Sequence, residues 1–368
     1  MKKIKVVTFL AVCGFLSAAA FVDPGTVFAQ DNASTRERTA PSPTPTPAAS
    51  VSPTPPKLRE EDEVVKVDTE LVNLNVRVVD RFNRPINNIP QNEFKVYEDN
   101  VLQQIDFFSR SEVPTNYSLV IDNSGSLRFQ IEKVIDAGKI IINTNRPDDE
   151  TSIIRFISRD KITVEQPFTS NKTDLNDTLD NLLIEGGQTA IIDAVYLAVD
   201  NLDEYERSKD PNDRKRRALI LVTDGEDRDS YYKEPQLFDR LRESDVQIYV
   251  IGFVSELDSS KGFISKSPQG KAKAFLERLA SETGGRAYFP NNTSELPGIA
   301  AEISNEMRMQ YSIGYLPSND RKDGTFRNIK VVVDDGPNKQ KRIAVARNGR
   351  TAESDGPAQV TPAKPKGQ

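Results

Sequence analysis

Three short segments of the 368-residue chain carry hydroxyl and carboxylate side chains of the kind that bind hard metal ions. The segments are Asp122-Asn123-Ser124-Gly125-Ser126, Gly186-Gly187-Gln188-Thr189 and Thr223-Asp224-Gly225. Hydroxyl and carboxylate oxygens suit Mg²⁺, which takes about six oxygen ligands and usually keeps several waters. The candidate ligands all offer an oxygen donor: Asp122, Ser124, Ser126, Thr189 and Asp224.

The composition excludes most other site chemistry. Histidine is absent and there is a single cysteine, so Ser-His-Asp triads, HExxH zinc sites and His-ligated iron or copper cannot be built. Any bound metal must therefore be a hard ion such as Mg²⁺, Mn²⁺ or Ca²⁺. The formal net charge of −6 also argues against a nucleic-acid partner, because proteins that bind phosphate backbones concentrate Lys and Arg.

The elements that must position these residues follow from hydrophobic patterning. Nearly continuous Val, Ile and Leu runs at 117–121, 152–157, 218–222 and 246–251 predict strands buried on both faces. Amphipathic helices are expected between them, the clearest over 127–142, and another over 296–307. This alternation predicts an α/β fold with a doubly wound, mostly parallel sheet. Ligands of such sheets bind where the strands end and strand order reverses, so the three segments are expected to meet there.

The flanks of this region have a different pattern. Polar and apolar residues alternate at 71–79, and short strands are expected near 94–97 and 104–107. The same period of two returns at 311–316, 326–333 and 342–346. We therefore expect strands from both flanks to pair into a small β-sandwich beside the α/β domain.

The chain ends have the composition of unfolded or processed segments. Lys2, Lys3 and Lys5 precede an apolar run over 6–22, and the segment ends at Val27-Phe28-Ala29, which predicts a secretory signal cleaved near Ala29; a retained anchor is the alternative. A Pro/Ser/Thr-rich stretch follows that favours an extended spacer. The predicted organisation is signal peptide 1–29, disordered linker 30–63, N-terminal β segment 64–112, α/β domain 113–309, C-terminal β segment 310–348 and disordered tail 349–368.

The order D-x-S-x-S, Gly-Gly-x-Thr and T-D-G resembles the metal-ion-dependent adhesion site of the von Willebrand factor A domain. The resemblance implies that Ser124 and Ser126 are direct ligands and that Thr189 is a direct or water-bridged one. It implies water-mediated or direct roles for Asp122 and Asp224. The implied ion is Mg²⁺, with Mn²⁺ and Ca²⁺ as alternatives. Segments such as 80–85, 94–99 and 311–315 also resemble secreted bacterial proteins of a von Willebrand A-related group prominent in acidobacteria.

We expect a secreted, periplasmic or cell-surface binding protein, without a transmembrane domain in the mature chain. Its metal would capture an Asp or Glu carboxylate of a protein or matrix ligand. The alternative is a structural or assembly subunit of a cell-envelope complex, in which the metal stabilises the fold. An enzyme is not expected, because no histidine can activate Ser124 and neither a P-loop nor GxGxxG occurs. The sequence identifies neither the ligand nor the oligomeric state.

Two charged segments have simpler interpretations. Residues 224–229 could form a separate calcium loop, but they lack the glycine at the sixth position and the distal Glu that accompany the 1-3-5 ligand spacing of an EF-hand. Glu226 and Asp227 are therefore interpreted as a solvated acidic rim. Residues 214–217 are basic and precede a buried strand. We interpret them as charges that flank an aggregation-prone strand and keep it soluble.

Overall fold

The computed structural model describes residues 71–110, 113–209, 215–254 and 267–354. The predicted signal peptide and linker lie outside these residues. Within them, no helix has the length and apolar character needed to cross a membrane.

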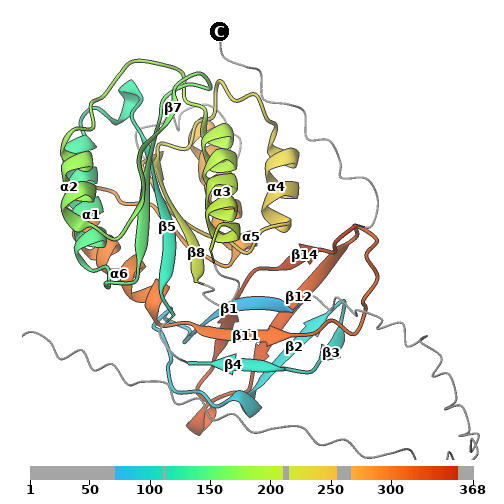
Figure 1. Cartoon of the computed structure of the whole chain (residues 1–368). Coiled ribbons are helices and arrows are strands. Elements are labelled where there is room, and N and C mark those ends of the chain that lie inside the picture. The colour runs from blue at the N-terminus through green and yellow to red at the C-terminus, as the bar shows by residue number, and fades with distance from the viewer. Residues whose placement is uncertain (1–70, 111–112, 210–214, 255–266, 355–368) are drawn as a thin grey trace, which may run out of the picture. The chain divides into compact units, whose positions relative to one another are not determined.

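A six-stranded sheet forms the centre of the α/β part, in the order β10-β9-β8-β5-β6-β7 (Figure 1). Neighbouring strands run parallel except β7, which is antiparallel to β6. Every residue of the central strand β5 is buried, as the apolar run at 117–121 leads us to expect. The strands are β5 (Thr115–Asp122), β6 (Glu150–Phe156), β7 (Ile162–Thr169), β8 (Arg216–Thr223), β9 (Gln247–Gly252) and β10 (Ala287–Tyr288).

Helices cover both faces of this sheet. One core joins the sheet to α3 (Ile191–Arg207), α4 (Glu234–Arg242) and α5 (Pro268–Thr283). A second core joins the other face to α1 (Ile131–Asn143), α2 (Lys172–Asp180) and α6 (Leu296–Arg308). Strand order reverses at β5, because β6 lies on one side of it and β8 on the other. The predicted doubly wound α/β fold is thus confirmed.

Two antiparallel sheets, ordered β13-β1-β11-β4 and β14-β12-β2-β3, share a third core (Figure 1). Strands from the two flanks pair directly: Val72 lies opposite Tyr315, and Phe94 lies opposite Val333. The predicted sandwich is confirmed. Its strands are β1 (Val72–Val79), β2 (Phe94–Glu98), β3 (Val101–Gln103), β4 (Phe107–Ser109), β11 (Tyr311–Tyr315), β12 (Phe326–Val333), β13 (Ile343–Val345) and β14 (Gly349–Thr351).

Three details differ from the sequence predictions. Strand β7 was not predicted, and the strand expected at 104–107 is replaced by β3 and β4 on either side of Asp106. Asp106 turns the chain: its N–H donates to Gly314 O, and its carboxylate accepts from Leu316 N–H. The disordered tail expected at 349–368 is wrong at its start, because 349–351 pair with β12 as β14. Residues 355–368 lie outside the described residues.

The basic segment before β8 is structural. Arg216 is buried, and its guanidinium donates to Gln310 O at 2.9 Å and to Met307 O at 3.2 Å. It thereby binds carbonyls at the end of α6 and at the start of the sandwich. Arg217 pairs with Asp203 at 2.5 Å and also with Asp245. The solubility interpretation is therefore wrong for these two residues, because their charges are used in internal contacts.

A second buried cation joins the sandwich to the α/β part. Arg77 of β1 lies 2.6 Å from Glu306 of α6, and both side chains are about 95% buried. Arg286 also contacts Glu306, at 2.9 Å. Ion pairs without water depend on both partners, since either charge alone is costly to bury.

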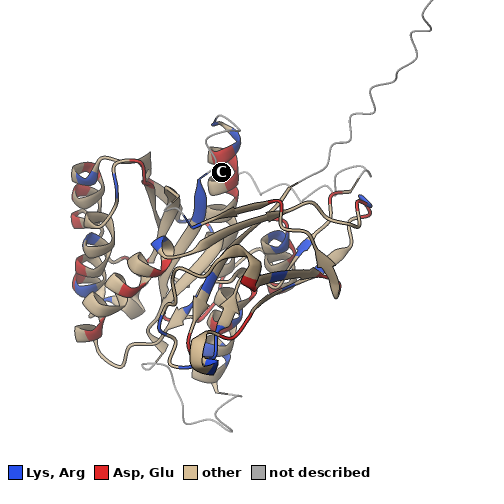
Figure 2. Ribbon diagram, turned by 90° about the horizontal axis from the view of Figure 1, so that it is seen from below, with Lys and Arg blue, Asp and Glu red and all other residues tan. Residues whose placement is uncertain are grey.

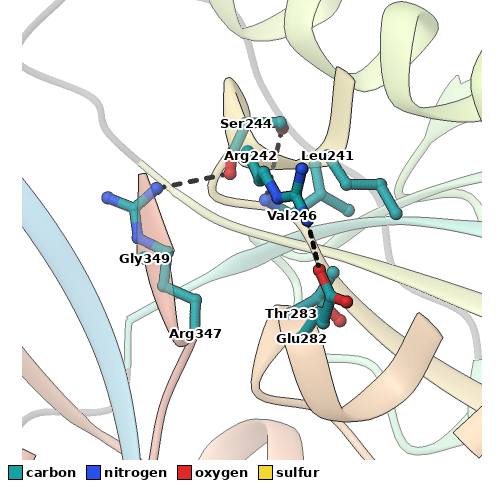
Figure 3. Close-up of a pocket in the computed structure, with 8 residues that line it drawn as sticks. All are labelled: Leu241, Arg242, Ser244, Val246, Glu282, Thr283, Arg347 and Gly349. Carbon is teal, nitrogen blue, oxygen red and sulfur yellow. Dashed lines mark hydrogen bonds and ion pairs between the residues drawn. The ribbon is translucent and has the colours of Figure 1, made fainter. Parts of the chain in front are cut away.

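A small cavity lies at another contact between the two parts (Figure 3). Arg347, between β13 and β14, donates to Ser244 O at 3.3 Å, and Arg242 contacts Glu282 at 3.5 Å. The cavity has a volume of about 10 Å³, which suits a single water molecule. It lies before the start of β9, at the sheet end opposite to the predicted metal site.

We expect Arg77→Ala to lower the free energy of unfolding by about 3 kcal/mol, because Glu306 would remain buried with fewer partners. Urea unfolding followed by circular dichroism measures this loss. Lys133→Ala is the matched control, since its pair with Asp136 is exposed and should contribute less than about 0.5 kcal/mol. Equal effects of the two substitutions would contradict the structural role of Arg77.

Candidate metal centre

Asp122, the last residue of β5, is fully buried and is held by both central strands. Its Oδ1 accepts from the Ser124 N–H at 2.9 Å. Its Oδ2 accepts from Oγ1 of Thr223, the last residue of β8, at 2.8 Å. The carboxylate is therefore fixed at the switch point between β5 and β8.

Asp224 follows Thr223 directly, is 5% exposed and brings a second carboxylate close to the first. Burial raises the pKa of Asp122 to about 6, and the charge of Asp224 contributes to this increase. In the described part of the chain, neither carboxylate forms an ion pair with Lys or Arg; nearby Arg228 pairs with Glu226 instead. Two neighbouring buried carboxylates that lack an ion pair suit a divalent cation.

The hydroxyls of Ser124 and Ser126 converge as the sequence predicts, with their Oγ atoms 2.8 Å apart. Ser124 is buried, whereas Ser126 is exposed on a 3-10 turn, so an ion bound here would be reachable from solvent. Neutral hydroxyls beside two carboxylates form a donor set that fits Mg²⁺, Mn²⁺ or Ca²⁺. Bound there, such an ion would supply Lewis acidity toward a further oxygen ligand.

Thr189 is buried just before α3. Its carbonyl accepts from the N–H groups of Arg228 and Asp229 at 2.8 and 3.1 Å, which ties its segment to the one after Asp224. In the described residues, no hydrogen bond joins Thr189 to Asp122, Ser124 or Ser126. The structure thus brings the three segments together, while the ligand role of each residue stays a prediction.

Two glycines allow these loops to pack closely. A Cβ on Gly187 would lie 2.4 Å from Ile157 Cγ2. Gly225 has φ of +85°, and a Cβ there would lie 2.8 Å from Leu276 Cδ1. Larger residues would push the Thr189 loop away from Ile157, which follows β6, and the Asp224 loop away from α5.

Two positioning residues were not predicted. Thr223 orients Asp122, as described above, and its Oγ1 accepts from the Gly225 N–H at 3.1 Å. Asn123 joins two loops: its side chain donates to Leu183 O at 2.9 Å, and its carbonyl accepts from the Glu185 N–H at 3.0 Å. Both lie inside the motifs, but their partners are distant in sequence, so the sequence carries no signal for these bonds.

The acidic segment after Asp224 does not form a calcium loop. Asp227 accepts from the Ile192 N–H at 3.2 Å at the start of α3, and Asp229 lies 3.7 Å from Arg159. Among the described residues, no group of three or more acidic side chains gathers as an all-carboxylate calcium loop in this segment would need. The solvated-rim interpretation is wrong for Asp227, because its carboxylate binds the first turn of α3.

A large cleft in the described part of the chain is lined partly by charges that are already paired. The cleft has a volume of about 900 Å³ and lies at the amino ends of the strands, and its charged residues include pairs such as Arg217–Asp203 and Lys215–Glu150. In the view of Figure 2, basic and acidic positions are interspersed along the ribbon. The absence of a nucleic-acid partner, expected from the net charge, stays a prediction.

Comparison with known proteins gives one family. The model of the von Willebrand factor type A domain matches residues 118–302. "Uncharacterized protein sll0103" of Synechocystis sp. (strain ATCC 27184 / PCC 6803 / Kazusa) is 35% identical over 115 residues, which cover 31% of this chain. The match spans only 26% of that relative's length. The narrower resemblance to an acidobacterial group stays a prediction.

Two solved structures are similar at low identity. The von Willebrand factor type A protein from Catenulispora acidiphila is 12% identical with a TM-score of 0.44, covering 78% of this chain and 74% of that one. Proximal thread matrix protein 1 from the mussel byssus, with a zinc-occupied MIDAS motif, is 20% identical with a TM-score of 0.41. The match covers 57% of this chain and 49% of the mussel protein's chain.

In the metal-free protein, we expect Asp122→Asn to raise the free energy of unfolding at pH 7.5 by about 1 to 3 kcal/mol. The folded-state pKa of Asp122 is raised from its ordinary value of 3.8 to about 6, so this residue costs stability as pH rises from 3.8 to about 6, and the loss is constant above that pH. Thermal unfolding in EDTA at pH 5 and pH 7.5 measures the effect. The gain should shrink at pH 5, and a variant less stable than the wild type at pH 7.5 would contradict the prediction.

Proposed function

The chain belongs to the von Willebrand factor type A domain family, whose model spans residues 118–302, and from that premise we propose a function. We propose a secreted or surface-exposed binding protein that holds Mg²⁺ or Mn²⁺ at Asp122, Ser124, Ser126, Thr189 and Asp224. The bound ion would capture an Asp or Glu carboxylate of a protein or matrix ligand. The extracytoplasmic location rests on the predicted signal peptide.

One observation carries this proposal. Asp122 and Asp224 are buried beside each other, and among the described residues neither forms an ion pair with Lys or Arg, while two serine hydroxyls converge next to them. Because the hydroxyls are neutral, the ion would keep enough positive charge to attract an anionic oxygen from another molecule. The exposed Ser126 marks the side from which that oxygen would approach.

The assembly alternative shares the metal but not the captured carboxylate. In that case the ion would neutralise Asp122 and Asp224 and hold the three loops together, and partners would bind elsewhere. Metal binding alone therefore does not distinguish the two functions, whereas chelator-sensitive ligand binding does.

We expect millimolar Mg²⁺ or Mn²⁺ to raise the Tm of the wild-type chain by about 2 to 5 °C relative to EDTA. Asp122→Ala should abolish this rise. Asp335→Ala is the matched control, because Asp335 lies in the sandwich part and pairs with Lys341 at 3.3 Å. Differential scanning calorimetry gives the result, and an unchanged metal response in Asp122→Ala would contradict the site.

The same three proteins then serve for ligand capture from envelope and culture extracts, with and without EDTA. The proposal expects a partner that the wild type and Asp335→Ala retain only with metal, and that Asp122→Ala loses. Binding that survives both EDTA and Asp122→Ala would contradict it. A folded Thr189→Ala variant that loses the metal yet still assembles with its partner would favour the assembly alternative.

We further propose that the protein is not an enzyme. In the described structure the Ser124 hydroxyl faces Ser126, the Ser124 N–H donates to Asp122, and histidine is absent from the chain. Screening the metal-loaded protein against ester, phosphate and peptide substrates should give no turnover above the Asp122→Ala variant. Turnover that depends on Ser124 would overturn this proposal.

A further inference from the structure

The most exposed large hydrophobic side chains of the described residues lie beside the candidate metal centre. Phe129, after the serine motif, is 89% exposed, and Leu183, in the loop before Thr189, is 72% exposed. Tyr231, in the loop after Asp224, is 40% exposed. Each of the three metal-site loops therefore offers one apolar side chain to solvent. We call Phe129, Leu183 and Tyr231 the apolar rim.

Phe129 is held outward by the turn that follows the serine motif. Leu127, two residues before it, and Gln130, directly after it, are at least 96% buried, and the Gln130 N–H donates to Leu127 O at 3.0 Å. With positions 127 and 130 fixed to the protein, the ring at position 129 projects into solvent three residues after Ser126.

Leu183 is fixed in a comparable way. Its neighbour Leu182 is buried, and the hydrogen bond from the Asn123 side chain to the Leu183 carbonyl places this loop beside the serine motif. The Leu183 carbonyl accepts from Asn123, and Glu185 pairs with Arg155 at 2.6 Å and Lys161 at 2.9 Å. The loop is therefore ordered while the Leu183 side chain stays exposed.

Tyr231 belongs to the loop after Asp224. Its N–H donates to Asp193 Oδ2 at 2.8 Å, which ties it to the first turn of α3. Its ring lies edge-on to Tyr232, with centroids 5.2 Å apart, and Tyr232 stacks on Tyr196 at 4.2 Å. These contacts hold the aromatic side chain in place before any ligand binds.

We propose that the apolar rim selects the ligand: a protein segment whose Asp or Glu is flanked on both sides by bulky apolar residues. This inference rests on the proposed function, since the metal takes the carboxylate. The metal–carboxylate bond is the same for any carboxylate, including that of an acidic polysaccharide. Only the surface around the ion can discriminate, and rigid apolar side chains favour apolar neighbours at low entropic cost.

The test uses the full chain, immobilised in Mn²⁺, and two synthetic peptide pools. Both pools carry a central Asp; one has Leu, Ile, Phe and Val at the two positions on each side, and the other has Ser, Gly, Asn and Thr. Peptides retained on the chain are quantified by mass spectrometry. We expect at least fivefold greater retention of the apolar pool, lost in EDTA and in a pool with Asn in place of Asp.

Phe129→Ser and Leu183→Ser should each reduce this preference at least twofold while the metal-induced rise in Tm is kept. Phe82→Ser is the matched control, because Phe82 is 69% exposed but lies on the turn after β1. Equal metal-dependent retention of the two pools would contradict ligand selection by the apolar rim but would not contradict the proposed function. Retention of neither pool, or retention unaffected by EDTA, would overturn both.

Discussion

Burying two like charges next to each other is unfavourable. Much of the structure around Asp122 and Asp224 reduces that cost. The two residues leave adjacent parallel strands at the point where strand order reverses, so the fold itself brings them together. Backbone N–H groups and the Thr223 hydroxyl meet part of the need for hydrogen bonds. The remaining charge is what a divalent cation would balance. A site of this kind is unstable when empty and becomes stable on binding.

The α/β part and the sandwich are joined by buried polar groups. Arg216 binds carbonyls around the end of α6, and Arg77 lies against Glu306 within the same helix. Such contacts contribute less net stability than an apolar core of equal volume would, but they tolerate little displacement because an unpaired buried charge is costly. They therefore specify the geometry at which α6 leaves the α/β part and enters β11.

Sequence patterns predicted the elements that are buried on both faces or alternate cleanly, such as β5 and β1, because burial restricts residue choice there. Strand β7 escaped prediction, since Glu165, Gln166 and Pro167 interrupt its pattern at the sheet edge. The strand-end motifs located the candidate site because chain order and sheet topology bring them to one edge. The Thr223–Asp122 bond, the contact of Asp227 with α3 and the carbonyls around Arg216 were not predictable. Each depends on partners far away in the sequence whose positions only the packed structure defines.

The α/β part is an insertion between β4 and β11, and these two strands pair with each other. A pull on anything bound at the strand-end loops would therefore reach the sandwich through two covalent connections that enter neighbouring strands. Strand β1, into which residue 71 leads, pairs with β11 on its other side. Tension between the bound object and the N-terminal side would thus pass through three adjacent strands of one sheet. Under load, the inserted domain is therefore held by two covalent connections, to β4 and to β11, and not by one.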